Sequence, residues 1–183
     1  MADFNISYKH TAINEGGYAN HPKDKGGETY AGVSRKNWPN WGGWRFIDGI
    51  KQQHGTTAAI INKYADASEI VHNLVLEFYK TNFWYPLNLN LVNDQQLANN
   101  VYDFAVNAGV TTAAKRLQRA AGVKYDGIIG NKTILAVNSQ PAKKLYDAFN
   151  DFRKAYYDNI IANNPSQAVF KNSWYSRIIP YKV

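Results

Sequence analysis

The sequence predicts a mainly α-helical protein with a small irregular or β-containing lobe near its N-terminus. Residues 18–55 are rich in glycine and show no sustained helical period, which indicates loops and short strands. From residue 56 onward, apolar residues recur at helical spacing behind residues that can cap a helix. A chain of 183 residues is long enough for one well-buried domain, or one domain of two lobes, but hardly for two independent cores.

The N-terminal part of the chain predicts one helix and one short strand. Asp3 is a suitable N-cap for a helix that carries Ile6, Ala12 and Ile13. The glycine pair Gly16-Gly17 would end this helix. Thr29 to Ser34 is the best strand candidate of the small lobe.

The remainder of the chain predicts a series of helices, each with its own start signal. The expected starts are Thr56 or Thr57, Ser68, Asp94, Thr111 or Thr112, Asn131 and Pro141, and a last short helix carries Phe170, Trp174 and Ile178. Gly109 and Gly122 are expected stops. In the helix after Ser68, the expected apolar stripe consists of Ile70, Leu74, Phe78, Val71 and Val75. We therefore expect lobes at residues 1–93 and 94–183 of a single domain.

Composition narrows the possible partners and cofactors. The net charge of +7 favours an anionic partner such as a nucleic acid, a membrane surface or the bacterial cell wall, although it also serves solubility. There is no cysteine, so disulfides and thiolate sites are excluded. The N-terminus lacks the pattern of a secretory signal, and no apolar stretch approaches membrane-spanning length. We expect synthesis in the cytoplasm, with any export by another route.

Glu15 is the first candidate catalytic residue. It is expected on the last turn of the first helix, where the negative end of the helix dipole disfavours the ionised carboxylate. Partial burial beside Tyr18 and Ile13 would act in the same direction, so both effects would raise the pKa of Glu15 towards the range of a general acid. On spacing alone, a solvated helix end is the simpler interpretation.

Asp24 is the candidate second carboxylate, in a loop between two lysines that favour its ionised form. An ionised carboxylate opposite a general acid would stabilise an oxocarbenium-like centre and hold a water or act as nucleophile. Glu28 competes for this role. Thr29 could donate a hydrogen bond nearby or be an ordinary strand residue.

Aromatic residues of the small lobe could bind sugar rings. Tyr18, Tyr30 and Trp41 offer flat apolar faces with a polar group at one end. Alternatively, the cluster formed by Trp41 with Trp38 and Trp44 fills a lobe that lacks regular structure. We favour this alternative for at least one of the three tryptophans.

Other chemistries find little support in the sequence. The four histidines are scattered without ligand spacing, so no metal or cofactor is expected. No glycine-rich phosphate loop follows a strand. The run from Lys115 to Arg119 loosely suggests a DNA-binding helix, but Asp126-Gly127 follows before the next helix, and a solvated helix face is the better interpretation. Nucleic acid is therefore not an expected partner.

Three blocks of the chain resemble the lysozyme-like N-acetylmuramidases of glycoside hydrolase family 108. The first comprises Glu15-Gly16-Gly17-Tyr18, residues 22–29 and Gly32-Val33-Ser34. The second is residues 102–109, which is similar to the inner helix that follows the cleft. The third is similar to the predicted peptidoglycan-binding region of these proteins and comprises residues 117–122, 126–130 and 133–137. The blocks stand in the expected order and cover nearly the whole chain.

The resemblance implies a lysozyme-like fold that cleaves the bond between N-acetylmuramic acid and N-acetylglucosamine. It places the proposed catalytic acid at Glu15. A further similarity to the catalytic trio of phage-type lysozymes suggests Asp24 and Thr29. Asp103 and Asn107 would line the cleft, or would instead anchor the inner helix through hydrogen bonds to the backbone.

We therefore predict a monomeric, cofactor-independent peptidoglycan hydrolase, either endolysin-like or cell-wall-lytic in another setting. The N-terminus without a secretory pattern fits a phage or prophage endolysin, and it also fits a cytoplasmic product released by lysis or by a dedicated secretion machinery. A bacteriolytic role would follow its release to the cell wall by a holin or a specialised machinery. Two alternatives stay open at this point. The chain could be a catalytically silent wall-binding or secretion-associated module, or it could be a lytic transglycosylase.

Overall fold

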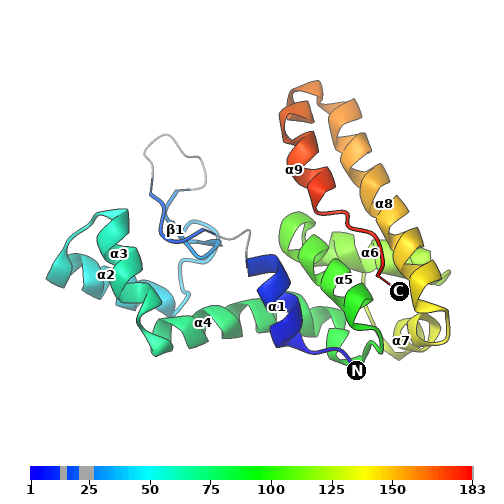
Figure 1. Cartoon of the computed structure of the whole chain (residues 1–183), viewed down its shortest axis with the longest axis horizontal. Helices are drawn as coiled ribbons and strands as arrows, with labels where there is room; N and C mark the ends of the chain where they lie inside the picture. Colours follow the sequence, from blue (N-terminus) through cyan, green and yellow to red (C-terminus); the bar gives the residue numbers. More distant parts are fainter. Residues whose placement is uncertain (13–15, 21–26, 183) are drawn as a thin grey trace. The chain divides into compact units, whose positions relative to one another are not determined.

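The computed structural model describes residues 1–12, 16–20 and 27–182, and most of its regular structure is helical (Figure 1). This confirms the mainly α prediction with a small β-containing part. The chain forms two compact units. The small unit is Tyr8–Asn82, and the large unit is Met1–Ser7 together with Phe83–Val183. The expected lobes at residues 1–93 and 94–183 stay a prediction.

The first helix and the helices of the small unit start largely where the sequence predicts. Helix α1 is Phe4–Ala12, and the Asp3 carboxylate accepts the Asn5 N–H at 2.6 Å. The small unit also holds α2 (Gly43–His54), α3 (Ala58–Asp66) and α4 (Glu69–Tyr79), and the π-helical turn η1 (Lys80–Trp84) follows α4. Thr57 caps α3 and Ser68 caps α4 through their hydroxyls. The expected helix end at Gly16-Gly17 involves residues 13–15, which lie outside the described residues.

The predicted strand from Thr29 to Ser34 is a tight hairpin rather than one strand. Strands β1 (Thr29–Tyr30) and β2 (Val33–Ser34) pair antiparallel. Ala31 and Gly32 between them have φ values of 46° and 75°. Two left-handed residues form the two-residue turn whose twist suits a hairpin. Ala19 also pairs with Thr29, so the chain just after Tyr18 lies beside β1.

The prediction that residues 18–55 form only loops and short strands is wrong, because helix α2 occupies Gly43–His54. Trp44 and Ile47, three residues apart, are buried on one face of α2. Two glycines weaken its local helix signal, so packing of this face provides most of its stability. Gly43 is required where it is, since a Cβ there would collide with the Trp41 ring.

In α4, the predicted apolar stripe is rotated from the face that is buried. Val71, Val75 and Phe78 are buried, as expected, but Ile70 is 57% exposed. Tyr79 is buried in addition. Apolar residues cover a wide arc of this helix, so their spacing alone does not select the part of the arc that packs.

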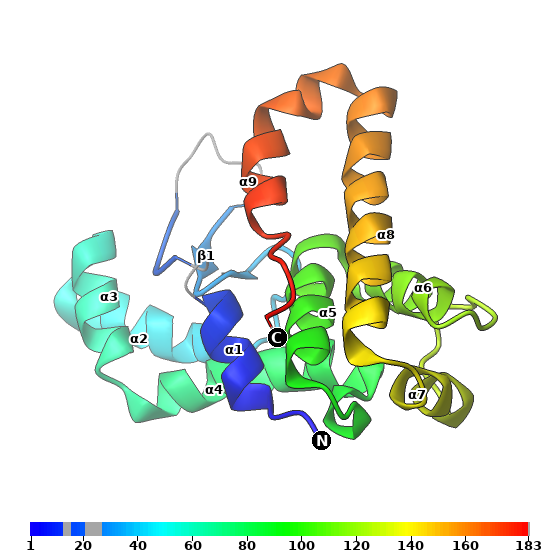
Figure 2. The same ribbon diagram turned by 45° about the vertical axis from the view of Figure 1, so that its right-hand side comes forward.

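The large unit is built around three helices. Its elements after η1 are η2 (Tyr85–Leu87), η3 (Leu89–Leu91), α5 (Gln95–Ala108), α6 (Val110–Ala120), α7 (Asn131–Asn138), α8 (Ala142–Asn163), η4 (Pro165–Phe170) and α9 (Lys171–Ser176). Helices α5, α6 and α8 pack on one another, and α9 lies beside α8 (Figure 2). Their shared core includes Phe104, Leu117 and Phe149, all fully buried.

Helix starts in the large unit were predicted with mixed accuracy. Asp94 caps α5 by accepting the Leu97 N–H at 2.7 Å, as predicted. The expected threonine cap of α6 is wrong, because α6 begins at Val110 directly after Gly109, whose φ is 90°. Asn131 is the first residue of α7 rather than its cap. Within the described residues, no helix combines the length and apolar character that crossing a membrane requires.

Candidate functional site

The two candidate catalytic carboxylates, Glu15 and Asp24, lie outside the described residues. The site is therefore built from described residues close to them in the sequence and from the elements that these residues contact in the small unit. They are the end of the Glu-Gly-Gly-Tyr motif, the β1–β2 hairpin and helix α3.

Asn62 of α3 holds the chain at the motif's second glycine and at the tyrosine that follows it. Its Oδ1 accepts the Tyr18 N–H at 2.7 Å. A Cβ added to Gly17 would lie 2.8 Å from Asn62 Cγ, whereas one added to Gly16 would meet nothing within 4 Å. The second glycine of the motif is therefore needed for close approach to Asn62.

The Tyr18 side chain is held at its other end by Glu28. Tyr18 is buried, and its hydroxyl donates a hydrogen bond to Glu28 Oε1 at 2.9 Å. Arg35 Nε lies 2.6 Å from Glu28 Oε2, and Lys51 also forms an ion pair with this carboxylate. Burial alone would lower the pKa of Lys51, but the hydrogen bond and the charge of Glu28 outweigh it and raise that pKa. This arrangement favours a structural role for Glu28.

A cavity of about 370 Å³ opens beside the motif, within the small unit. Its lining comprises Tyr8, Gly16, Gly17, Tyr30, Ala31, Ala65, Asp66, His72 and Val75. The predicted sugar-binding residue Tyr30 thus lies in the same wall as the two glycines that follow Glu15. Tyr18, Thr29 and Trp41 are not among the described residues that line this cavity.

Tyr30 and Asp66 form a polar pair at the cavity. The Tyr30 hydroxyl donates a hydrogen bond to Asp66 Oδ1 at 2.9 Å. Burial, followed by the hydrogen bond and charge of Asp66, raises the pKa of Tyr30 well above its ordinary value. Tyr30 therefore remains a hydrogen-bond donor throughout the physiological pH range.

The tryptophan cluster packs mainly on itself and on its neighbours. Trp44 is 3% exposed and donates its indole N–H to the Trp38 carbonyl at 2.8 Å. The Trp41 indole stacks on Tyr30 with an interplanar angle of 18° and donates to the Leu74 carbonyl. Filling of the lobe is thus confirmed for Trp44, and a sugar-binding role of Trp41 stays a prediction.

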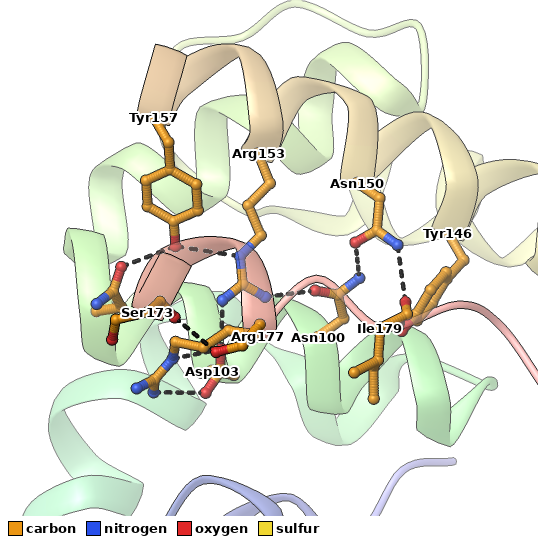
Figure 3. A network of polar contacts seen from close by, with 11 residues as sticks. Asn100, Asp103, Tyr146, Asn150, Arg153, Tyr157, Ser173, Arg177 and Ile179 are labelled. Atoms are coloured by element: carbon orange, nitrogen blue, oxygen red, sulfur yellow. Dashed lines mark hydrogen bonds and ion pairs between the residues drawn. The ribbon is translucent and has the colours of Figure 1, made fainter. Parts of the chain in front are cut away.

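Asp103 and Asn107 both belong to α5 in the large unit. Asp103 contacts side chains of other elements, as Figure 3 shows. Arg153 of α8 forms an ion pair with Asp103, and Arg177 Nη2 lies 2.6 Å from Asp103 Oδ1. The Tyr157 hydroxyl donates to Asn107 Oδ1 at 2.8 Å. Both residues thus anchor α5, but to side chains rather than to the backbone. Their substrate-binding role stays a prediction.

Sequence reasoning missed Asn62 and Asp66. They lie one helical turn apart on α3, next to the buried residues Ile61 and Ala65. Residues four apart share a helix face, so a polar pair beside an apolar pair was the available signal. The sequence did not show that this face of α3 lies against the motif.

Comparisons with known proteins bear on the family of the chain. The family model described as Glycosyl hydrolase 108 matches residues 8–109, and the model described as Predicted Peptidoglycan domain matches residues 112–179. No curated protein matches the chain. A solved structure entitled "Structure of Brucella abortus SagA" is similar, with 26% identity and a TM-score of 0.64. The similarity covers 96% of this chain and 88% of that one.

The two matched regions contain all three blocks on which the resemblance in the sequence rested. The Glu-Gly-Gly-Tyr block and residues 102–109 fall within the first region, and residues 117–137 fall within the second. The first region covers more than half of the chain. The chain therefore belongs to the glycosyl hydrolase 108 family and is a glycoside hydrolase that acts on peptidoglycan.

Proposed function

We propose that the protein is an N-acetylmuramidase that cleaves the bond between N-acetylmuramic acid and N-acetylglucosamine. The observation that carries this proposal is the cavity whose wall contains Gly16 and Gly17, directly after Glu15, within the region matched by the hydrolase family. Glycosidic bond cleavage needs a carboxylic acid that protonates the glycosidic oxygen, and Glu15 directly precedes these glycines in the sequence.

In the proposed mechanism, Glu15 is the general acid and Asp24 the ionised partner. Asp24 stabilises positive charge at the reacting carbon and positions water. One observation supports Asp24 over Glu28, because the Glu28 carboxylate is already occupied by Arg35, Lys51 and Tyr18.

The proposal includes how the enzyme reaches and holds its substrate. The region matched by the peptidoglycan domain and the net charge of +7 suit retention on anionic wall polymers. An endolysin role, with holin-type or specialised release to the wall, is part of this proposal.

The role of Glu15 is tested by comparing wild type with Glu15→Gln on purified murein sacculi. Glu69→Gln is the matched control, because Glu69 is an exposed residue of α4 outside the cavity lining. We expect Glu15→Gln to lose at least about 100-fold in reducing-end release and Glu69→Gln to keep wild-type activity. Equal release by wild type and Glu15→Gln would remove Glu15 from the mechanism.

Mass spectrometry of the soluble products tests the reaction type. A muramidase releases fragments with reducing N-acetylmuramic acid. Anhydro-muramyl products would show a lytic transglycosylase instead. Binding to sacculi without soluble products would show a silent binding module.

A further inference from the structure

The cavity beside the Glu-Gly-Gly-Tyr motif combines a charged wall with an apolar one. Its volume of about 370 Å³ lies within the range of small-molecule sites, about 300–1,000 Å³. Asp66 is the carboxylate among its described lining residues, and Tyr8, Tyr30 and His72 are the other polar side chains. Ala31, Ala65 and Val75 complete the lining. Polar groups placed among apolar side chains are typical of sites that orient a ligand.

Asp66 occupies a position that does not favour the stability of its own helix. It is the last residue of α3, where the negative end of the helix dipole repels a carboxylate. It is also exposed, so burial does not force its presence. The hydrogen bond from Tyr30 orients it. A carboxylate held in an unfavourable place at a cavity wall points to a function rather than to stability.

The Asp66 carboxylate has acceptor capacity beyond the bond from Tyr30. Two carboxylate oxygens together accept about four hydrogen bonds, and the Tyr30 hydroxyl supplies one. N-acetylated sugars present hydroxyl and acetamido N–H groups as donors. A muramic acid unit without a stem peptide also carries a free lactyl carboxylate, which an anionic wall would repel.

We propose that Asp66, oriented by Tyr30, is a substrate-binding residue that recognises the uncharged N-acetylglucosamine unit of the glycan and disfavours the lactyl-bearing unit. This inference rests on the proposed function, since it names the sugar taken by one part of the same cleft. Tyr30 is the positioning residue, and its hydroxyl holds the carboxylate in the orientation that the sugar meets.

The test measures binding in the Glu15→Gln background, so that no ligand is cleaved. The probes are fully N-acetylated chitotetraose and a peptide-free tetrasaccharide of alternating N-acetylglucosamine and N-acetylmuramic acid, titrated by calorimetry. We expect Asp66→Asn to weaken chitotetraose binding about tenfold, because a neutral amide accepts hydrogen bonds more weakly than a carboxylate. We expect the tetrasaccharide to lose less affinity, because the repulsion is removed at the same time.

Two further variants and a stability measurement on Asp66→Asn separate binding from folding. Tyr30→Phe should weaken chitotetraose binding severalfold, while Asp147→Asn, at a half-exposed ion pair of α8, should leave it unchanged. Asp66→Asn should unfold at the same denaturant concentration as its parent or a higher one, since it removes a charge that the helix end disfavours. A purely structural Asp66 would give the reverse, with lower stability and unchanged affinity.

The outcomes are independent of those of the proposed function. Folded Asp66→Asn with parental affinity for both probes would overturn the inference, even if wild type cleaves sacculi. Loss of chitotetraose affinity together with the absence of cleavage by wild type would leave the sugar site standing and overturn the muramidase proposal.

Discussion

At the scale of single residues, the two glycines of the Glu-Gly-Gly-Tyr motif have different surroundings. Gly17 lies against Asn62, and Gly16 faces open space. The motif therefore needs its second glycine for packing, whereas the first is not required by the contacts around it. The two polar residues of α3 also differ. Asn62 accepts a hydrogen bond from the backbone N–H of Tyr18, whereas Asp66 lines the cavity.

Substituting these glycines tests this difference. We expect Gly17→Ala to lower the free energy of unfolding by about 1–3 kcal/mol, because its methyl group would displace Asn62. Gly16→Ala is the matched control and should change it by less than about 0.5 kcal/mol. Urea denaturation measures both values. Equal effects of the two substitutions would contradict the assigned contact.

The raised pKa of Tyr30 predicts that the folded protein loses stability in alkaline solution. Burial and Asp66 raise its pKa in the folded protein above the ordinary value of 10.0. Its contribution is thus complete below pH 10 and falls above it, because the unfolded chain releases the phenolic proton first. Between pH 10 and 11, wild type should lose about 1 kcal/mol more than Tyr30→Phe, because the unfolded chain goes from about half to about nine-tenths ionised at this residue. Urea titrations at both pH values compare the slopes, and parallel slopes would contradict the assignment.

At the scale of elements, Glu28 joins the hairpin to α2. It precedes β1 directly, Arg35 follows β2, and Lys51 belongs to α2. Arg35 also donates two hydrogen bonds to the Asp48 carboxylate of α2. Hydrogen bonding from Arg35 is the largest of the effects that hold the pKa of Asp48 below its ordinary value. The ion cluster thus ties a four-residue sheet to a helix that local propensity supports weakly.

The ion cluster around Glu28 predicts that substitution of Glu28 affects stability, whereas substitution of Asp24 affects activity. Glu28→Gln should lower the free energy of unfolding by about 1–3 kcal/mol, because two cations lose their common partner, while the folded variant keeps kcat. Asp24→Asn should keep stability and lower kcat by about 100-fold or more. Thermal unfolding and reducing-end release measure the two properties. A Glu28→Gln variant that is stable but inactive would exchange the roles assigned to Glu28 and Asp24.

Much of the element order could be predicted because helix caps are local. Thr57, Ser68 and Asp94 each act on an N–H three residues away, so their patterns are complete within a few residues. Helix α2 and the hairpin turn were not predicted. The first depends on burial of Trp44 and Ile47 against distant residues, and the second required Ala31 in a left-handed conformation.

At the scale of the whole molecule, a buried polar network holds the large unit together. Arg153 is fully buried on α8, and its guanidinium contacts Asp103, Asn100 and Tyr157 (Figure 3). Arg177, directly after α9, binds the same Asp103 through two hydrogen bonds. One carboxylate of α5 therefore connects α8 with the C-terminal segment.

The network predicts that Asp103 contributes mainly to stability. Asp103→Asn should cost about 3–5 kcal/mol, because it leaves the buried Arg153 without its counter-charge. Asp147→Asn, at the half-exposed pair with Lys143, should cost less than about 1 kcal/mol. Guanidinium denaturation compares them. A stable Asp103→Asn with a raised KM for sacculi would support the substrate-binding prediction instead.

The chain's own patterns were sufficient for the helical class, most helix starts, the family and the motif at Glu15, because each depends on neighbouring residues or on a short block. The tertiary structure decided which polar groups meet. It joined Glu28 to two cations, Asp103 to two arginines and Tyr30 to Asp66, and it laid Asn62 against Gly17. These contacts link residues between 7 and 74 positions apart. Whether a carboxylate faces a substrate or a counter-charge is determined by packing across such separations, which the spacing of residues along the chain does not encode.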